Sequence, residues 1–372
     1  MPHTLIVGAG IAGLSLAIAL RRRGVEPDIV ERLPDGPTEG AGLYLVGNAT
    51  RALRALGLGE RVILAGRRVY TQRVFSHTGP QLATADVEAF WKGCGPCIGL
   101  RRSHLHSALS GEAAGLRIRF GITVQSLQQQ ADKVSVQFND GSTSTYDVVV
   151  GADGIRSTVR RLEFGESRPT FRGQVGWRFI AALPDGIEGW SAFLGRGCTF
   201  LFVPVGEHEA YCYADQNVPT PNQDRADRRL QRLRTLFDDF AAPVRATLAR
   251  MRESDPIHFA PIEEVIAPAM GRGRIVLIGD AAHAMSPSMA SGAAMAFEDA
   301  LVLADLLTRD GDVPAAIEGF VRRRGPRIQW VRSQTDRRDR MRRLPPVLRN
   351  TVLRLLWPQI YAGNYRPLLG PL

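Results

Sequence analysis

The sequence predicts an α/β protein in which a Rossmann-like domain carries an inserted antiparallel sheet and is followed by C-terminal helices. The first observation is the succession of an apolar strand, a glycine-rich turn and a helical pattern over residues 4–24. The second is a pair of apolar strands, at 148–151 and 275–279, that each run into a turn containing aspartate. The third is a series of strand-like segments over 171–215 with no helix between them, which favours an antiparallel sheet.

Length and composition are those of an ordinary globular protein. The 372 residues predict two domains and leave room for a third. The net charge is +10, but only Lys92 and Lys133 among the 47 basic residues are lysine, so we attribute the bias to a GC-rich coding genome rather than to a nucleic-acid partner. We find no apolar stretch of about 20 residues, no signal peptide and no metal-ligand spacing. A cytoplasmic protein with no membrane span, no nucleic-acid partner and no metal is expected.

The N-terminal unit has the pattern of a dinucleotide-binding site. GAGIAG at 8–13 follows a buried strand and opens a helix. Gly8 allows a tight turn, Gly10 lets the backbone approach a pyrophosphate, and Gly13 lets the helix lie close to the sheet. Glu31 ends the second strand, where a carboxylate can bind an adenosine ribose. Glutamate followed by Arg32 favours FAD, and NAD remains an alternative.

Two further motifs place aspartate after an apolar strand. In DVVVGADGIRSTVRR, Asp153 lies at the turn after the strand, and taken alone it would be a simple Asp-Gly turn. In RIVLIGDAAHAMSP, Asp280 follows the strand and precedes a small-residue loop and a helix. A carboxylate at a strand end, next to a helix N-terminus, can bind polyol hydroxyls and present N–H groups to an anion.

Together these motifs resemble those of the FAD-dependent aromatic hydroxylases, the single-component flavoprotein monooxygenases related to p-hydroxybenzoate hydroxylase. GAGIAG with Glu31 is similar to the family's ADP-binding motif, GADGIRSTVR to its Asp-Gly motif, and GDAAHAMSP to its Gly-Asp motif. The segment 40–62 resembles the segment that follows the second strand in one branch of the family, which contains zeaxanthin epoxidase, urate hydroxylase and the 3-hydroxybenzoate hydroxylases. LRRSHLHSAL at 100–109 is similar to the helix that places an arginine, here Arg102, near FAD.

The resemblance covers nearly the whole chain and implies a discontinuous FAD-binding domain of the GR2 type, interrupted by a substrate-binding domain. The expected boundaries are 1–70, 98–165 and 268–343 for the first domain, 71–97 and 166–267 for the second, and 344–372 for a C-terminal helical segment.

The same resemblance implies that FAD is bound non-covalently by the three motifs and by the arginine helix. The residues expected to contact it are Gly8, Gly10, Ala12, Gly13, Glu31, Arg32, Arg102, Asp153, Gly279, Asp280, Pro287, Ser291, Gly292, Ala293 and Ala294.

One loop departs from the family pattern. Gly-Gln-Gly-x-Asn is usual after Pro287, whereas here Ser291 stands for the glutamine and Ala294 for the asparagine, with Gly292 kept. Backbone donors to the flavin would survive these changes and side-chain contacts would not. We therefore expect the potential or the mobility of the flavin to differ from that in relatives.

In the family, an antiparallel sheet covers the flavin and walls the substrate pocket. Since side chains alternate along a strand, only one face of each strand can look inward. Phe200 and Phe202 share a face, as do Tyr211 and Tyr213, so an aromatic-lined pocket is expected, with ordinary core packing as the alternative. The candidate pocket residues are Trp177, Arg178, Phe200, Phe202, Tyr211 and Tyr213.

The resemblance implies an NAD(P)H-dependent monooxygenase that hydroxylates an aromatic or heteroaromatic small molecule with O2, through a flavin C4a-hydroperoxide. NAD(P)H is expected as a transient co-substrate, and the protein as a monomer or homodimer. An epoxidase, or another flavin oxidoreductase of this fold acting on a non-aromatic or polycyclic natural product, is the alternative. No catalytic base is identified, and the candidates for a catalytic role are Arg178, His283 and Tyr213.

Cys94 and Cys97 form a Cys-x-x-Cys pair, a spacing typical of dithiol redox sites. A flavin disulfide reductase would need a second dinucleotide fold, and no second G-x-G-x-x-G follows a strand here. The next helix is expected to start near Ser103, so neither cysteine would lie at a helix N-terminus. We therefore expect no dithiol chemistry.

The C-terminal segment 344–361 has an apolar helical face formed by Val347, Leu348, Val352, Leu355 and Leu356. This face is expected to pack on the body of the protein or near the pocket entrance, with contact to a membrane surface as the alternative.

Overall fold

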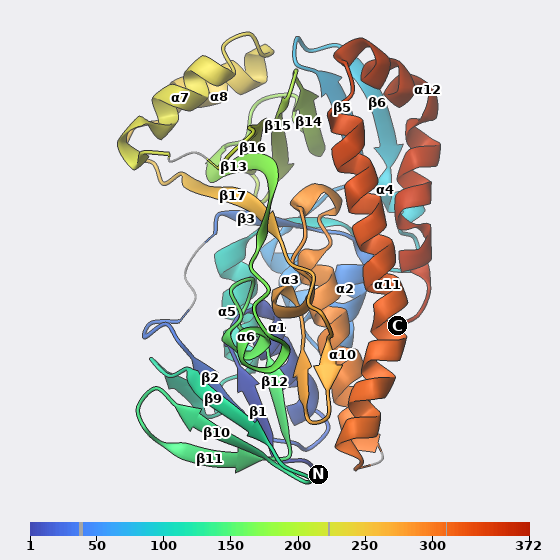
Figure 1. The fold of residues 1–372 in the computed structure, drawn as a ribbon. Coiled ribbons are helices and arrows are strands. Elements are labelled where there is room, and N and C mark those ends of the chain that lie inside the picture. Colours follow the sequence, from blue (N-terminus) through green and yellow to red (C-terminus); the bar gives the residue numbers. More distant parts are fainter. Residues whose placement is uncertain (37–39, 222–223, 310) are drawn as a thin grey trace.

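The computed structural model describes residues 1–36, 40–221, 224–309 and 311–372. Its lower half in Figure 1 is built on a six-stranded sheet of order β18-β19-β12-β1-β2-β8. All neighbouring strands are parallel except the pair formed by β18 and β19. The strands are β1 (Thr4–Val7), β2 (Asp28–Glu31), β8 (Ile118–Phe120), β12 (Val148–Gly151), β18 (Gly271–Arg272) and β19 (Ile275–Leu277).

The upper half contains a seven-stranded sheet of order β17-β13-β16-β15-β14-β5-β6 (Figure 1). Its strands are β5 (Thr71–Ser76), β6 (Gln81–Asp86), β13 (Thr170–Ala182), β14 (Trp190–Leu194), β15 (Cys198–Pro204), β16 (Glu209–Asn217) and β17 (His258–Glu264). The pairing is antiparallel except between β14 and β5, which are parallel. The sequence predicted only antiparallel pairs among the segments over 171–215. It missed the parallel pair because β5 lies in an earlier part of the chain and joins this sheet through a long connection.

Two three-stranded sheets complete the strand framework. One contains β3 (Gly42–Leu45), β4 (Arg67–Arg68) and β7 (Ile98–Arg101), all antiparallel. The other contains β9 (Val124–Gln129), β10 (Val134–Phe138) and β11 (Thr143–Tyr146), also antiparallel. The helices are α1 (Ile11–Arg21), α2 (Gly47–Ala55), α3 (Gly59–Ala65), α4 (Val87–Phe90), α5 (Arg102–Glu112), α6 (Thr158–Phe164), α7 (Arg229–Leu236), α8 (Ala242–Arg250), α9 (Asp280–His283), α10 (Gly292–Arg309), α11 (Val313–Arg342) and α12 (Pro346–Tyr365).

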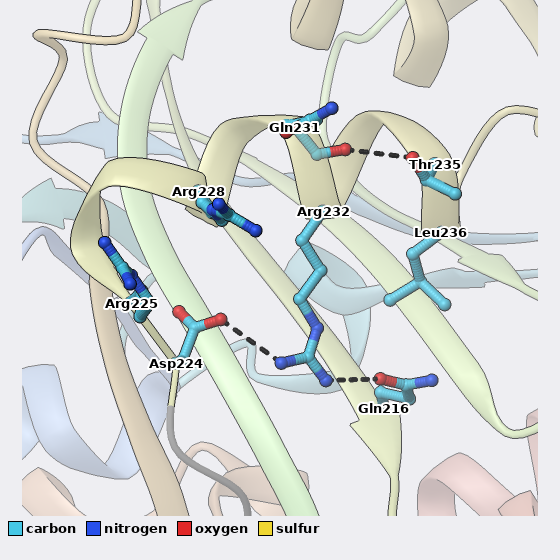
Figure 2. A pocket seen from close by; sticks show the side chains of 8 residues that line it. All are labelled: Gln216, Asp224, Arg225, Arg228, Gln231, Arg232, Thr235 and Leu236. Carbon is cyan, nitrogen blue, oxygen red and sulfur yellow. Dashed lines mark hydrogen bonds and ion pairs between the residues drawn. The ribbon is translucent and has the colours of Figure 1, made fainter.

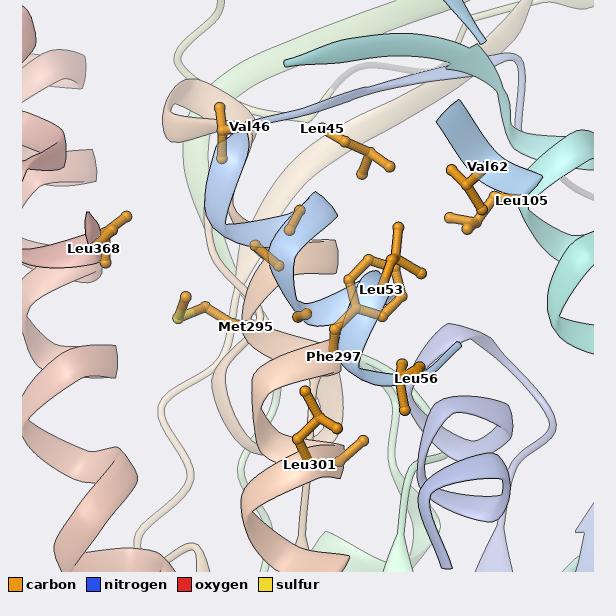
Figure 3. Close-up of a cluster of buried hydrophobic side chains, with 14 of the residues drawn as sticks. Leu45, Val46, Leu53, Leu56, Val62, Leu105, Met295, Phe297, Leu301 and Leu368 are labelled. Carbon is orange, nitrogen blue, oxygen red and sulfur yellow. The ribbon is translucent and has the colours of Figure 1, made fainter. Parts of the chain in front are cut away.

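The main hydrophobic core joins segments that are far apart in the sequence. Helix α10 packs against both α1 and α2. Figure 3 shows Phe297 of α10 beside Leu53 of α2, and both side chains are fully buried. Apolar residues recur along α10 at the spacing of a helix face, which is why this helix can be buried between two others.

A buried group of charged side chains fastens α10 to α11. Arg324 of α11 donates to Glu298 at 2.8 Å and to Asp299 at 2.7 Å, and all three side chains are almost fully buried. Arg327 donates to both oxygens of Glu298, at 2.7 and 2.8 Å. Asn48 of α2 donates to Glu298 at 2.9 Å, so the network also reaches α2.

Replacing Arg324 with Met is expected to lower the free energy of unfolding by about 3–5 kcal/mol, because two buried carboxylates would lose their shared cation. Denaturant unfolding followed by circular dichroism measures this change. Arg309→Met is the matched control, since the Arg309 ion pair with Asp305 is exposed and is worth at most about 1 kcal/mol. Equal stability of the two variants would contradict a stabilising role for the network.

Candidate functional site

A cavity of about 700 Å³ lies between the two large sheets. One end is formed by turns that follow the parallel strands, and the other by the inner face of the seven-stranded sheet with α11 and α12. Because the carboxyl ends of parallel strands meet at one edge, the motifs after β1, β12 and β19 come together there. Gly10, Ala12, Gly154 and Asp280 all line this end.

The turn after β1 leaves space that a ligand can occupy. A Cβ added to Gly10 would meet no atom within 4 Å, and α1 begins after Gly10 with no side-chain cap. The first N–H groups of α1 therefore remain available to an anion. A Cβ on Gly13 would lie 1.8 Å from the carbonyl oxygen of Gly8, so Gly13 allows α1 to lie against the turn. These two glycines fit the two requirements of a pyrophosphate site.

Glu31 and Asp153 are both held by backbone N–H groups. Glu31 accepts from Ala9 at 2.8 Å and from Leu33 at 2.9 Å, which fixes its carboxylate beside the turn after β1. Asp153 accepts from Thr158 at 2.6 Å and so caps α6, while its Oδ1 is buried with no hydrogen-bond partner among the described residues. Burial raises the pKa of Asp153. Neither carboxylate lines the cavity, although the neighbours of Asp153 do.

The two predicted arginines differ in position. Arg102, at the start of α5, lines the cavity, and Gly40 makes room for it, since a Cβ there would lie 2.3 Å from Arg102 Cδ. Arg32 is exposed and does not line the cavity. Arg102 therefore can reach a ligand in the cavity directly, whereas Arg32 lies outside it.

The loop before α10 borders the same space. Pro287, Ser291, Gly292 and Ala293 line the cavity, and Ala294 is buried in the core instead. Ser291 donates its hydroxyl to the carbonyl of Met289 at 2.9 Å. The side chain that stands for the family's glutamine is therefore used inside the loop.

The inner face of the seven-stranded sheet forms the other end of the cavity. Arg178, Tyr211 and Tyr213 line it, as the sequence led us to expect for a pocket wall. Trp177, Phe200 and Phe202 lie on the opposite face, fully buried in a core that includes residues of α7 and α8 and Phe237, which follows α7.

The strand register explains this separation. In the pairing of β15 with β16, Leu201 is opposite Tyr213, whereas Phe200 is opposite Ala214 and Phe202 is opposite Cys212. Cross-strand partners share a face of the sheet. Leu201 therefore shares the face of the tyrosines, and the two phenylalanines lie on the other face. The sequence indicated which residues of one strand share a face, but the pairing between strands selected the inner one.

The sequence analysis missed a buried polar group at this end. Asp215 of β16 is fully buried and accepts a hydrogen bond from Arg342 of α11, which also donates to Thr199 at 3.0 Å. Asp215 Oδ2 and the Tyr213 hydroxyl are buried and make no hydrogen bond of good geometry with any described residue. Burial raises the pKa of Asp215, although Arg342 and the nearby Tyr213 hydroxyl oppose the shift. A ligand with polar groups could satisfy these atoms.

Asp215 could have been found from the sequence, because it follows Tyr211 and Tyr213 at intervals of two residues and so shares their face. Other missed residues reach the cavity only through tertiary packing. These are Gln72 of β5, Arg342 of α11, and Arg349 and Trp357 of α12.

Comparison with known proteins agrees with this arrangement. A family model described as FAD binding domain matches residues 2–312. The chain is 32% identical to the aurachin C monooxygenase/isomerase of Stigmatella aurantiaca, over 85% of this chain and 83% of the relative. It is 33% identical to the 2-heptyl-3-hydroxy-4(1H)-quinolone synthase of Pseudomonas aeruginosa, over 95% and 94%. The solved structure of Klebsiella pneumoniae HpxO complexed with FAD and uric acid superposes with a TM-score of 0.91 at 24% identity, covering 99% and 97%.

The chain belongs to the FAD-dependent monooxygenase family. The predicted family, α/β fold class and FAD cofactor are thereby confirmed. Within the described residues, no helix of the monooxygenase is long and apolar enough to cross a membrane.

His283 of the monooxygenase lies outside the cavity, in the buried charge network. Its Nε2 is 2.6 Å from Asp299 Oδ2, and the same oxygen accepts from the Gly279 N–H at 3.0 Å. Burial opposes ionisation of Asp299, but the charges of His283 and Arg324 lower its pKa. Asp299 therefore connects the turn that precedes Asp280 to α10 and α11. His283 is placed to hold this turn rather than to contact a substrate.

Gly279 also determines how this turn meets α1. Its φ is +57°, and a Cβ there would lie 2.8 Å from the Cβ of Ala12. Only glycine combines this backbone conformation with such a close approach. The small size of Gly279 therefore lets this turn lie against Ala12 of α1.

The cysteine pair lies in the loop between α4 and β7 and does not line the cavity, although Cys97 lies against Tyr44, which does. Cys97 is fully buried, and burial raises its pKa to about 12. Burial also raises the pKa of Cys94. Since the thiolate is the reactive form, both environments oppose thiol reactivity at neutral pH.

A second hollow, of about 520 Å³, lies beside α7 and is lined by polar residues and Leu236 (Figure 2). Asp224 lies at its floor and binds Arg229 at 2.8 Å and Arg232 at 3.3 Å. It also accepts from Trp177 Nε1 at 3.1 Å. These bonds fasten α7 to the outer face of the sheet, so we assign the hollow a structural role.

Two glycine substitutions should separate folding from cofactor binding. Gly13→Ala is expected to lower the stability of the deflavinated monooxygenase by about 1–3 kcal/mol, because α1 must move away from Gly8. Gly10→Ala should leave that stability within about 0.5 kcal/mol and weaken FAD binding at least about tenfold. Chemical denaturation and fluorescence titration with FAD measure the two effects. Unchanged FAD affinity in Gly10→Ala would contradict the assignment of this turn to the pyrophosphate.

Proposed function

We propose that this monooxygenase uses NAD(P)H and O2 to hydroxylate a heteroaromatic small molecule that carries both hydrogen-bond donors and acceptors. The observation that carries the proposal is a cavity that joins the dinucleotide edge of one sheet to a wall on the other, where buried polar atoms lack a well-formed hydrogen bond to any described residue. FAD and substrate would meet inside it, screened from water by both sheets.

The residues at the dinucleotide edge fit FAD. The open N-terminus of α1 at Gly10 suits the pyrophosphate, and Glu31, held by two N–H groups, can accept from the adenosine ribose. Asp280 lies where it can bind the ribityl or ribose hydroxyls, and the 287–293 loop can present backbone N–H groups to the ring. When bound, FAD supplies the redox chemistry that activates dioxygen.

The other end of the cavity would orient the substrate. Asp215 Oδ2 can accept a hydrogen bond from a ring N–H or a hydroxyl, and the Tyr213 hydroxyl can donate to a carbonyl oxygen. The guanidinium carbon of Arg178 lies 5.5 Å from the ring centroid of Tyr213, and its positive charge can stabilise negative charge that develops on an activated substrate. These residues bind and orient the substrate, and Asp215 can hold its proton.

Similarity supports the substrate class that we propose. One relative is named for a quinolone product, and one structural neighbour contains uric acid. Both molecules contain a flat heterocycle that presents ring N–H and carbonyl groups, and the quinolone also carries a heptyl chain. Apolar side chains that line the same cavity as Asp215, which include Leu201 and Leu353, would cover the rest of such a ring.

The layout of the sheets also supports the domain boundaries that we propose. Residues 71–97 and 166–267 would form the substrate-binding domain around the seven-stranded sheet. Residues 1–70, 98–165 and 268–343 would form the FAD-binding domain, followed by the helical segment 344–372. Because α11 and α12 contribute to the cavity wall, both domains and the C-terminal segment would be needed for a complete site.

The purified, FAD-loaded protein is expected to show flavin absorption and substrate-stimulated oxidation of NAD(P)H. A panel of phenols, heteroaromatics and polycyclic quinones should identify the substrate class by NAD(P)H consumption and by a product heavier by one oxygen atom. Stimulation by heteroaromatics with both N–H and carbonyl groups supports the proposal. Product formation only from non-aromatic or polycyclic compounds would favour the epoxidase-like alternative, and a protein that binds no FAD would contradict the whole assignment.

Asp215→Asn is expected to reduce kcat/KM by about 10- to 100-fold, since the substrate loses a hydrogen bond to a charged acceptor. Steady-state kinetics with the substrate found in the panel measure this loss, with FAD content as a check on the fold. Asp185→Asn is the control, because Asp185 is exposed in the same part of the chain. Equal kcat/KM in both variants would remove Asp215 from the substrate site.

A further inference from the structure

The apolar face of α12 points away from the protein. Val347 and Leu355 are 82% and 70% exposed, and Leu348 and Leu356 are about half exposed. The sequence analysis expected this face to pack on the protein body or near the pocket entrance, and the structure corrects that expectation. Scattered exposed leucines are ordinary, but four large apolar side chains on one helix face form a patch that calls for a partner.

The opposite face of α12 accounts for the packing of the helix. Leu353, Trp357 and Tyr361 are buried, and the Tyr361 hydroxyl accepts from Trp91 Nε1 at 2.9 Å. Arg349 is buried as well and donates to the carbonyls of Gly195, at 2.7 Å, and Leu194, at 3.1 Å. These contacts fix the rotation of α12 about its axis. The exposed face is therefore presented to the surroundings by a well-anchored helix.

The charged residues of the C-terminal segment itself are of one sign, although the exposed Asp86 lies on β6, against which α12 packs. Residues 340–372 contain six arginines and no aspartate or glutamate. Arg342 and Arg349 face inward, whereas Arg354 and Arg366 are exposed and form no ion pair with any described residue. The outer side of α12 thus combines large apolar side chains with free positive charge, which is the composition of a helix that lies in a lipid interface.

We propose that the outer face of α12, formed by Val347, Leu348, Val352, Leu355 and Leu356, docks on the surface of an anionic lipid bilayer. The leucines would enter the boundary between headgroups and acyl chains, and the exposed arginines would bind the anionic headgroups. A second copy of this chain fits less well, because pairing two such faces would bring two acid-free, arginine-rich segments together.

Docking in this orientation would place the cavity wall at the lipid surface. Leu353, Trp357 and Ile360 on the inner side of α12 line the cavity, only one helix thickness from the proposed lipid contact. An apolar substrate dissolved in the bilayer would then have a short route to the cavity. The docking itself depends on the exposed face and the charge of α12, and it does not require the proposed hydroxylation.

Co-flotation of the FAD-loaded protein with vesicles tests the proposal. The protein should float with vesicles of phosphatidylcholine containing about one third phosphatidylglycerol, and much less with phosphatidylcholine alone. Binding should weaken as salt is raised. The double variant Leu355→Asp/Leu356→Asp should bind the anionic vesicles at least about tenfold more weakly, because two apolar anchors become negative charges.

Leu64→Asp is the matched control, since Leu64 is 83% exposed on α3 and lies outside the patch. It should bind vesicles as the unmodified protein does, and all variants should retain FAD and the same thermal stability. Failure of the unmodified protein to float, or equal flotation of the double variant, would overturn the proposal. A dimer in light scattering that the double variant alone dissociates would assign the face to a second copy instead. Loss of hydroxylation with intact flotation would count only against the proposed function.

Discussion

The structure depends on the close approach of α1 to the carboxyl edge of the six-stranded sheet. Gly13 contacts the Gly8 turn through bare backbone, and Gly279 leaves space for Ala12. Any Cβ at these positions would push the helix away from the strands. Because α1 lies so close, its N-terminus points across the ends of β1, β12 and β19, and the motifs after these strands face one cavity. The cofactor end of the site is a consequence of this packing.

The buried charge network around Asp299 also fixes the turn after β19. Asp299 accepts hydrogen bonds from the Gly279 N–H and from Arg324, and it lies against His283, so one carboxylate joins a turn and two helices. Burying so many charges is costly unless each has partners, and here each carboxylate has at least two. The network therefore couples the position of the Asp280 turn to α11, whose far end supplies Arg342 to the cavity wall beside Asp215.

The two ends of the cavity differ in how they satisfy polar groups. At the cofactor end, backbone N–H groups bind the predicted carboxylates and leave the helix N-terminus open. At the end proposed for the substrate, Asp215 and Tyr213 keep buried atoms with no well-formed hydrogen bond among the described residues. A small molecule that supplies those partners gains affinity and selectivity together, since an analogue that lacks them leaves the same atoms unpaired. This difference supports a fixed cofactor and a chemically selected substrate.

The sequence by itself determined the family, the α/β fold and the FAD motifs, because each motif is local: a strand, a turn and a helix within about 15 residues set the backbone geometry that a pyrophosphate or a ribose needs. Tertiary structure alone decided which aromatic residues face the cavity, since the pairing of β15 with β16 set Leu201 opposite Tyr213 and turned Phe200 away. It also brought Arg342 and Trp357 to the cavity from helices far along the chain. The direction of the apolar face of α12 was decided in the same way. Amphipathic spacing shows that a helix has two faces, and only the packing of Leu353, Trp357 and Tyr361 showed which one is buried.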